Sequence, residues 1–215
     1  MQQVNRYYQP CLTLLLIMYL AGFIGLQVPA LSAFFLTLVP FNMLVSVGIL
    51  LLFHTQWNYA FLACCILTFI SGFLIEVAGI QTGIIFGQYE YGATLGTKLL
   101  HVPLLIGINW LILVYCAGTI SFQIKAAWWI QAGVGALLMV LLDFFIEPIA
   151  VALDFWHWQE GEIPFQNYLA WFIIAYMLIG FFLQLSFRKD NRIAMPLYCI
   201  QLLFFVFHNL YSLLK

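Results

Sequence analysis

Seven long apolar runs dominate this sequence, and each is long enough to cross a bilayer. A membrane-spanning helix needs about 20 predominantly apolar residues, and such runs lie near residues 11–27, 31–53, 59–80, 99–119, 127–151, 167–187 and 193–213. Only 7% of the residues are charged, against about 25% in an ordinary soluble domain. The sequence therefore predicts an all-α fold, a polytopic membrane helical bundle of about seven transmembrane helices, in a single domain over residues 1–215.

The basic residues predict the orientation of this bundle. Lys and Arg are enriched in cytoplasmic loops, and seven spans place five of them on the side of the N-terminus: Arg6, Lys125, Arg188, Lys189 and Arg192. Lys98 and Lys215 fall on the other side. We therefore expect a cytoplasmic N-terminus. The net charge of −1 offers no basic surface for nucleic acid.

Three carboxylic acids interrupt the apolar runs. Glu76 lies near the end of the third span, and Asp143 and Glu147 lie toward the end of the fifth. An ionised carboxylate at the bilayer centre costs about 2.5–3.5 kcal/mol on insertion scales, and intramembrane acids are functional by default. Because the third and fifth spans run in the same direction, we expect all three acids in one half of the bundle.

Asp143 and Glu147 are four residues apart and so share one face of a helix. Two carboxylates that close repel when both are ionised, so at least one is expected to hold its proton near neutral pH. Such a buried acid is what general acid catalysis requires. The structural alternative is that the protonated acids only hydrogen-bond neighbouring helices.

The remaining chemistry-bearing residues give few further signals. His101, at the predicted start of the fourth span, is placed to pair with a carboxylate or to relay a proton. The five cysteines lie in apolar runs without the spacing of a redox or metal motif. No metal-binding, nucleotide-binding or Ser-His-Asp motif stands out, so we expect no metal.

Two stretches, residues 76–110 and 142–172, together resemble a known family. They contain the patterns E-x-x-G-x-x-T-G from Glu76, D-x-x-x-E-P from Asp143 and P-F-x-N-Y from Pro164. This combination resembles the membrane-embedded carotenoid biosynthesis family that includes the carotenoid 1′,2′-hydratases and the bisanhydrobacterioruberin hydratases. The two stretches cover about a third of the chain.

The resemblance implies a reaction and a location. Water would be added across the terminal C1′=C2′ double bond of an acyclic (ψ) carotenoid end group, as in lycopene or γ-carotene, giving a tertiary alcohol without a cofactor. It also implies an integral protein of a bacterial cytoplasmic membrane. Its partners would be membrane lipid, a lipid-soluble carotenoid that enters between helices, and other enzymes of the carotenoid pathway.

The residue types suggest which side chain carries out each step of such a reaction. Protonation at C2′ leaves a tertiary cation at C1′ and needs a strong, buried acid. We expect Asp143 to be the general acid and Glu147 its partner, although the two roles are interchangeable. Glu76 would hold or deprotonate the water, with His101 as the relay. Residues expected to hold water or substrate are Tyr89, Asn109, Trp110, Phe144, Trp156, Asn167 and Trp171.

Four other functions remain open at this point. A proton- or ion-coupled transporter also carries intramembrane acids, but these acids gather at one end of the bundle. A carotenoid end-group cyclase shares the protonation step and excludes water, and only the resemblance favours the hydratase. A seven-helix photoreceptor would need a lysine in the last span, which has none. A purely structural membrane subunit is the fourth.

Overall fold

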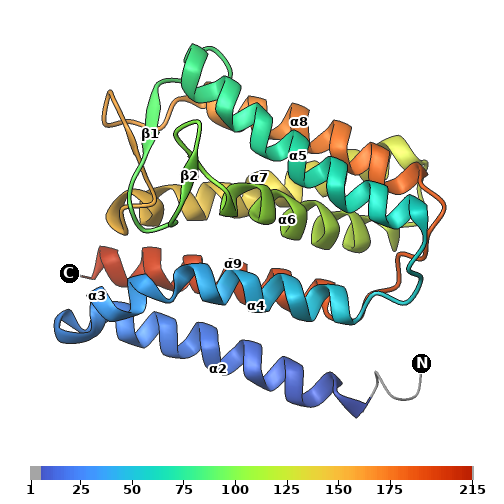
Figure 1. Ribbon diagram of the computed structural model, residues 1–215, viewed down its shortest axis with the longest axis horizontal. Helices are drawn as coiled ribbons and strands as arrows, with labels where there is room; N and C mark the ends of the chain where they lie inside the picture. Colours follow the sequence, from blue (N-terminus) through green and yellow to red (C-terminus); the bar gives the residue numbers. More distant parts are fainter. Residues whose placement is uncertain (1–5, 215) are drawn as a thin grey trace.

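The computed structural model describes residues 6–214, which form eight α-helices and four short strands (Figure 1). The helices are α2 (Tyr8–Gln27), α3 (Pro29–Thr37), α4 (Val39–Leu52), α5 (Tyr59–Thr82), α6 (Leu105–Phe122), α7 (Trp128–Ala152), α8 (Phe165–Gln184) and α9 (Ala194–Leu213). The strands are β1 (Tyr89–Tyr91), β2 (Lys98–Leu99), β3 (Val102–Pro103) and β4 (Trp156–Trp158). Within this range six helices are long and apolar enough to cross a membrane, and the bent pair α3 and α4 makes a seventh if it is one span. The predicted all-α membrane bundle is confirmed.

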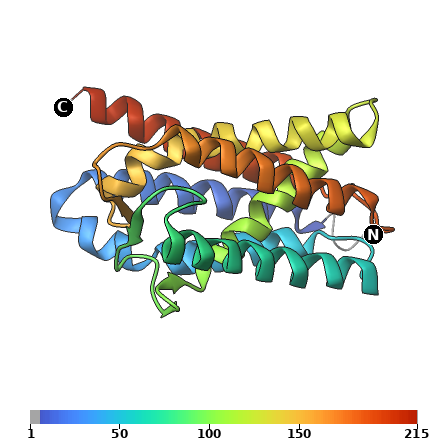
Figure 2. The same cartoon turned by 90° about the horizontal axis from the view of Figure 1, so that it is seen from above.

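The helices are stacked in layers. Helices α5 and α8 form one outer layer, α6 and α7 lie in the middle, and α2, α4 and α9 cover the other side (Figure 1). The start of α2 and the end of α9 lie at opposite ends of the bundle (Figures 1 and 2), as an odd number of crossings requires. All four strands lie at the end opposite the start of α2, which we call the strand-bearing end.

The basic loops are separated as the sequence predicts. The start of α2, next to Arg6, and the loops α6–α7 and α8–α9 lie at one end of the bundle, whereas β2, with Lys98, lies at the strand-bearing end (Figure 1). Lys215 lies outside the described residues. The cytoplasmic location of the N-terminus stays a prediction.

The second predicted span, residues 31–53, is bent rather than straight. Helices α3 and α4 are inclined by 51° at the break between them. Pro40 lies in the first turn of α4, where its missing N–H is tolerated, but its ring disfavours a continuous helix through the preceding turn. The bend leaves Phe35 of α3 on the wall of a large cavity described below.

The fourth predicted span, residues 99–119, begins later than expected. Helix α6 starts at Leu105, and residues 98–103 form the hairpin of β2 and β3 instead. The turn residues Leu100 and His101 have positive φ angles of 52° and 69°, which suits a two-residue hairpin turn. Hydropathy misplaces this start because Leu99, Leu100 and Val102 are as apolar in a hairpin as in a helix. His101 is therefore exposed in a turn and does not begin a helix.

The two long connections pair with each other. Strand β1 runs antiparallel to β4, with Glu90 opposite His157 at the centre of both. Successive side chains of a strand point to opposite faces, and in both strands the outer two residues are buried while the central one is more exposed. The buried side chains are Tyr89, Tyr91, Trp156 and Trp158. This small sheet directs four aromatic polar groups into the strand-bearing end of the bundle.

Helices α5 and α6 pack closely at two glycines. A Cβ atom on Gly72 would lie 2.4 Å from Cβ of Trp110, and one on Gly107 would lie 2.8 Å from Cδ2 of Phe69. Small residues allow this close approach of membrane helices. The contact fixes the position of the Trp110 side chain against α5.

We expect Gly72→Ala to destabilise the folded protein by about 1–3 kcal/mol, because overpacking a filled interface costs this much. Thermal unfolding of the detergent-solubilised protein, followed by tryptophan fluorescence, measures the effect. Gly133→Ala is the control, since the nearest atom of another helix to a Cβ there is Cε2 of Tyr176, at 4.0 Å. Equal unfolding temperatures for the two variants would contradict this account of the α5–α6 interface.

Candidate active site

Glu76 is a buried carboxylate held by three hydrogen-bond donors. It is 4% exposed. The hydroxyl groups of Tyr89 and Tyr91 both donate to its Oε2, the second at 2.9 Å. Nε1 of Trp110 donates to its Oε1 at 3.1 Å. Donors to the charged form offset the cost of burying it, so this position suits a carboxylate that stays negatively charged.

Both tyrosines keep their protons and remain donors. Burial raises the pKa of Tyr89 and of Tyr91 well above the usual value, and the neighbouring charge of Glu76 raises each pKa further. Tyr91 is absent from the site expected from the sequence. The signal for it is the alternation Tyr89-Glu90-Tyr91, which puts both rings on one face of a strand.

Asp143 and Glu147 share the amide of one asparagine. Nδ2 of Asn167, in the first turn of α8, donates to Oδ2 of Asp143 at 3.0 Å and to Oε1 of Glu147 at 3.1 Å. The other oxygen of Glu147, Oε2, accepts bonds from Nε1 of Trp156 at 3.0 Å and of Trp158 at 2.8 Å. The two carboxyl groups therefore lie on one face of α7, as their spacing predicts.

The two carboxyl groups differ in their surroundings. Glu147 accepts from three donors, whereas Oδ1 of Asp143 has no hydrogen-bond partner among residues 6–214. Two charged carboxylates that share one amide repel each other. One proton on the pair removes this repulsion, and Asp143 is the better place for it at rest because it has the fewer donors.

Trp158 is the second residue that the expected site lacks. Its signal is again an alternation, Trp156-His157-Trp158, in which the two indoles share a face. His157 points away and binds Oδ1 of Asp154 at 2.7 Å. That hydrogen bond holds the pKa of the exposed Asp154 carboxyl below its usual value. His157 and Asp154 therefore form a surface pair next to the site.

One small pocket has two carboxylates on its wall, those of Glu76 and Glu147. The other lining residues are Phe86, Tyr89, Tyr91, Ile106, Asn109, Trp156, Trp158, Asn167 and Trp171. Its volume is about 20 Å³, enough for one water molecule with polar partners. Asp143, 1% exposed, is bonded to Asn167 behind this wall.

Aromatic contacts join the surroundings of the two acids. The indoles of Trp110 and Trp171 stack with centroids 4.3 Å apart and planes inclined by 14°. The rings of Tyr89 and Trp158 lie 5.1 Å apart across the β1–β4 pair. Because the donors to Glu76 and Glu147 pack on one another, the spacing between the two acids is fixed by rigid groups.

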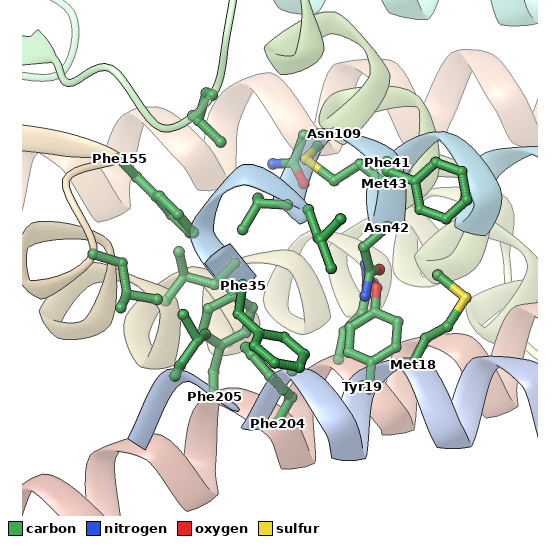
Figure 3. A pocket seen from close by; sticks show the side chains of 18 of the residues that line it. Met18, Tyr19, Phe35, Phe41, Asn42, Met43, Asn109, Phe155, Phe204 and Phe205 are labelled. Atoms are coloured by element: carbon green, nitrogen blue, oxygen red, sulfur yellow. The ribbon is translucent and has the colours of Figure 1, made fainter. Parts of the chain in front are cut away.

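A large apolar cavity, shown in Figure 3, lies next to the small pocket. It measures about 330 Å³ and lies among α2, α3, α4, α6, α7 and α9. Ile106, Asn109 and Trp156 line both spaces, so these side chains form a wall that the two share. Ile17 of α2 and Phe41 of α4 also line the cavity, and they are 58% and 59% exposed. The cavity therefore reaches the outer surface between α2 and α4, which faces lipid in a membrane.

Nine of the eleven expected site residues come together here, and two do not. Seven line the small pocket, and Asp143 and Trp110 stand behind it, bonded to Asn167 and to Glu76. Phe144 is 56% exposed, and its ring lies near those of Phe145 and Tyr168. His101 is exposed in the β2–β3 turn and lines neither space.

The reasons for these two differences are simple. Phe144 follows Asp143 by one residue, and one residue is a rotation of about 100° around a helix, so the two side chains cannot share a face. His101 was expected at a helix start, and the hairpin moves it outward. Neither a substrate contact for Phe144 nor a relay by His101 has support within residues 6–214.

These features define a polytopic membrane protein with a polar pocket of two carboxylates next to a lipid-facing apolar cavity. The family described as "Carotenoid biosynthesis protein" matches residues 32–214. The chain belongs to this family, and the resemblance drawn from the sequence motifs is confirmed.

One curated relative narrows the comparison. The bisanhydrobacterioruberin hydratase of Haloarcula japonica is 32% identical over 118 residues, which are 50% of this chain and 40% of that protein. The matched region thus spans well under two thirds of the relative. No solved structure matches the chain. The comparisons establish that this chain is a carotenoid biosynthesis protein and that one of its relatives is a hydratase.

Proposed function

We propose that this protein is a carotenoid hydratase that adds water across the terminal C1′=C2′ double bond of an acyclic (ψ) end group. The observation that carries the proposal is the small pocket, which has room for one water between Glu76 and Glu147 and shares Asn109 with the wall of an apolar cavity. The motif resemblance and the name of the Haloarcula relative point to the same reaction.

The apolar cavity suits the end of a polyene. Its wall is almost entirely apolar and aromatic, as ligand pockets for apolar molecules are. The exposed side chains of Ile17 and Phe41 mark its mouth. A carotenoid is confined to the lipid, so it enters between α2 and α4 and advances its end group toward Asn109.

The chemistry uses one proton and one water. The Asp143–Glu147 pair gives a proton to C2′, and the two electrons of the double bond form the new C–H bond, leaving a tertiary cation at C1′. Glu147 delivers this proton because it lines the pocket, while Asp143 holds it at rest. Water then bonds to C1′ and gives one proton to Glu76, and return of that proton to the pair completes the cycle.

Aromatic faces and a carboxylate stabilise the cation. Trp171 lines the pocket and is stacked on Trp110, so its orientation is fixed. An aromatic face within about 6 Å of a cation stabilises it, and the charge of Glu76 adds an electrostatic contribution in a site that excludes bulk water. These groups are in place before reaction, which is what transition-state stabilisation requires.

Two alternatives are less well supported. A cyclase must keep water from the cation, whereas here a polar space for one water lies between two carboxylates. A transporter needs polar groups along the whole path. Glu76, Asp143 and Glu147 instead lie in the half of the bundle near the strands, and Leu113, Ala136 and Met139 are among the buried apolar residues of α6 and α7 beyond them.

Expression in cells that accumulate lycopene or γ-carotene tests the proposal. Pigments are extracted and separated, and their molecular masses are measured by mass spectrometry. We expect products whose mass exceeds that of the substrate by one water. Cells that carry the empty vector provide the baseline. Unchanged pigments in cells whose membranes contain the folded protein would refute the hydratase.

The substrate path can be tested apart from the acids. Gly22 lines the cavity, and a Cβ there would first meet Cε2 of Phe204 at 3.7 Å. We expect Gly22→Leu to fill part of the cavity and to raise KM about tenfold, a loss of about 1.4 kcal/mol in substrate binding. Gly48→Leu is the matched control on α4, since a Cβ at Gly48 meets nothing within 4 Å. Equal KM values for the two variants would place the substrate elsewhere.

A further inference from the structure

The apolar cavity contains one polar cluster away from the acids. Nε2 of Gln201 donates to the hydroxyl of Tyr19 at 3.2 Å, and that hydroxyl lies 3.3 Å from Oγ of Ser46. Oγ of Ser46 in turn donates to Oδ1 of Asn42 at 3.3 Å. Figure 3 shows Tyr19 and Asn42 near each other on the cavity wall, apart from Asn109. The cluster joins α2, α4 and α9.

The cluster has an acceptor that nothing occupies. Gln201 is 7% exposed and lines the cavity, and its Oε1 has no hydrogen-bond partner among residues 6–214. A buried amide oxygen without a partner costs about 1–3 kcal/mol. The bond to Tyr19 uses Nε2, so the chain of hydrogen bonds fixes the side chain without satisfying Oε1, which is itself buried at rest. Because Gln201 lines the cavity, a small turn of its amide presents Oε1 to a ligand there that brings a donor.

The cluster lies beside the route between the acid pocket and the lipid. Asn42 directly follows Phe41, and Tyr19 lies two residues after Ile17, and these two neighbours are the exposed residues of the mouth. Asn109 marks the other end, where the cavity meets the small pocket. A molecule that leaves the acids for the lipid therefore passes the Gln201 cluster.

We propose that Gln201, positioned by Tyr19 and Ser46, binds the hydroxyl group of the hydrated end group as the product leaves. This inference rests on the proposed function, since that function supplies the alcohol. A new tertiary hydroxyl that moves from the polar pocket into an apolar cavity loses its hydrogen-bond partners, which is costly. Oε1 of Gln201 accepts a bond from that hydroxyl midway and so lowers the cost of release.

The competing explanation is that the cluster only holds three helices together. Hydrogen bonds between helices often have this role in membranes, and the Tyr19–Gln201 bond links α2 to α9. Such a role requires neither an unpartnered acceptor nor a position on the cavity wall. The two explanations differ in whether the cluster distinguishes a hydroxylated ligand from an unhydroxylated one.

The test compares binding of two unreactive ligands that differ only in hydroxyl groups. The ligands are 1,2,1′,2′-tetrahydrolycopene and its 1,1′-dihydroxy derivative, whose ends lack the reactive double bond. Purified full-length protein in detergent is incubated with an equal mixture, and the retained pigments are measured. We expect the wild-type protein to favour the dihydroxy ligand about tenfold, the value of one buried hydrogen bond, and Gln201→Met to bring the ratio to about one.

Two further variants separate binding from folding. Tyr19→Phe keeps the Gln201 acceptor but removes the group that positions it, so the ratio should fall by a smaller factor, about threefold. Thr119→Val is the control, because it removes another buried hydroxyl that has no hydrogen-bond partner among residues 6–214. Thr119 lies on α6, off the cavity wall, so the variant should keep the wild-type ratio. A wild-type ratio in both Gln201→Met and Tyr19→Phe, with lowered unfolding temperatures, would overturn the subsite and leave the helix contact.

The outcome is independent of turnover. If cells that make lycopene show no hydration while the purified protein keeps the Gln201-dependent ratio, the hydratase fails and the hydroxyl subsite stands. If hydration occurs and Gln201→Met keeps the wild-type ratio, the subsite fails alone.

Discussion

Glu76→Gln is expected to lower the rate of hydration by about 10²–10⁴-fold, the usual contribution of a positioned general base. The amide has nearly the shape of the carboxylate but cannot take a proton from water. It also turns an N–H₂ group toward a site where Tyr89, Tyr91 and Trp110 already donate, so a donor faces donors. Both effects fall on the step in which water bonds to C1′.

The measurement is product formed per unit of folded protein in membranes that contain lycopene. Glu90→Gln is the matched control, because Glu90 lies between the two tyrosines on β1 but is exposed and points away from the pocket. It removes a carboxylate charge from the strand that carries both tyrosines and should retain wild-type activity. Full activity in Glu76→Gln would exclude Glu76 as the base.

Much of the fold follows from hydropathy, because lipid requires long, uninterrupted apolar helices. The predicted spans 59–80, 127–151 and 193–213 lie within two residues of the observed bounds of α5, α7 and α9. The bend between α3 and α4 and the late start of α6 escape this reasoning. In both places the residues remain apolar, so hydropathy does not register that the backbone has left the straight helix.

The candidate site was predictable in its acids and less so in their partners. Buried carboxylates stand out in an apolar sequence, and helical spacing places Asp143 beside Glu147. The pairing of β1 with β4 is a contact between connections more than 60 residues apart, and nothing in the spacing of the spans specifies it. That pairing brings Tyr91 and Trp158 to Glu76 and Glu147, although the alternation in each strand already marks them as side chains of one face.

Glu147→Gln is expected to reduce hydration more than Asp143→Asn does. Glu147 lines the pocket, whereas Asp143 lies behind Asn167 and does not, so only Glu147 reaches the double bond. Loss of the group that delivers the proton should cost about 10²–10⁴-fold. Loss of Asp143, which holds the proton at rest, should lower the rate less, by about tenfold, or about 1.4 kcal/mol. The effect is smaller because Glu147 still exchanges protons with the water of the pocket.

Initial rates of both variants, measured with equal amounts of folded protein, decide between the two assignments. Glu160→Gln is the control, since Glu160 is exposed in the connection after β4 and should retain wild-type activity. A larger loss in Asp143→Asn would make Asp143 the general acid, and its unpartnered Oδ1 would then be the atom that donates. That result requires the end group to pass Asn167, because the amide separates Asp143 from the pocket wall. The order of the two rates thus locates the double bond on one side of Asn167 or the other.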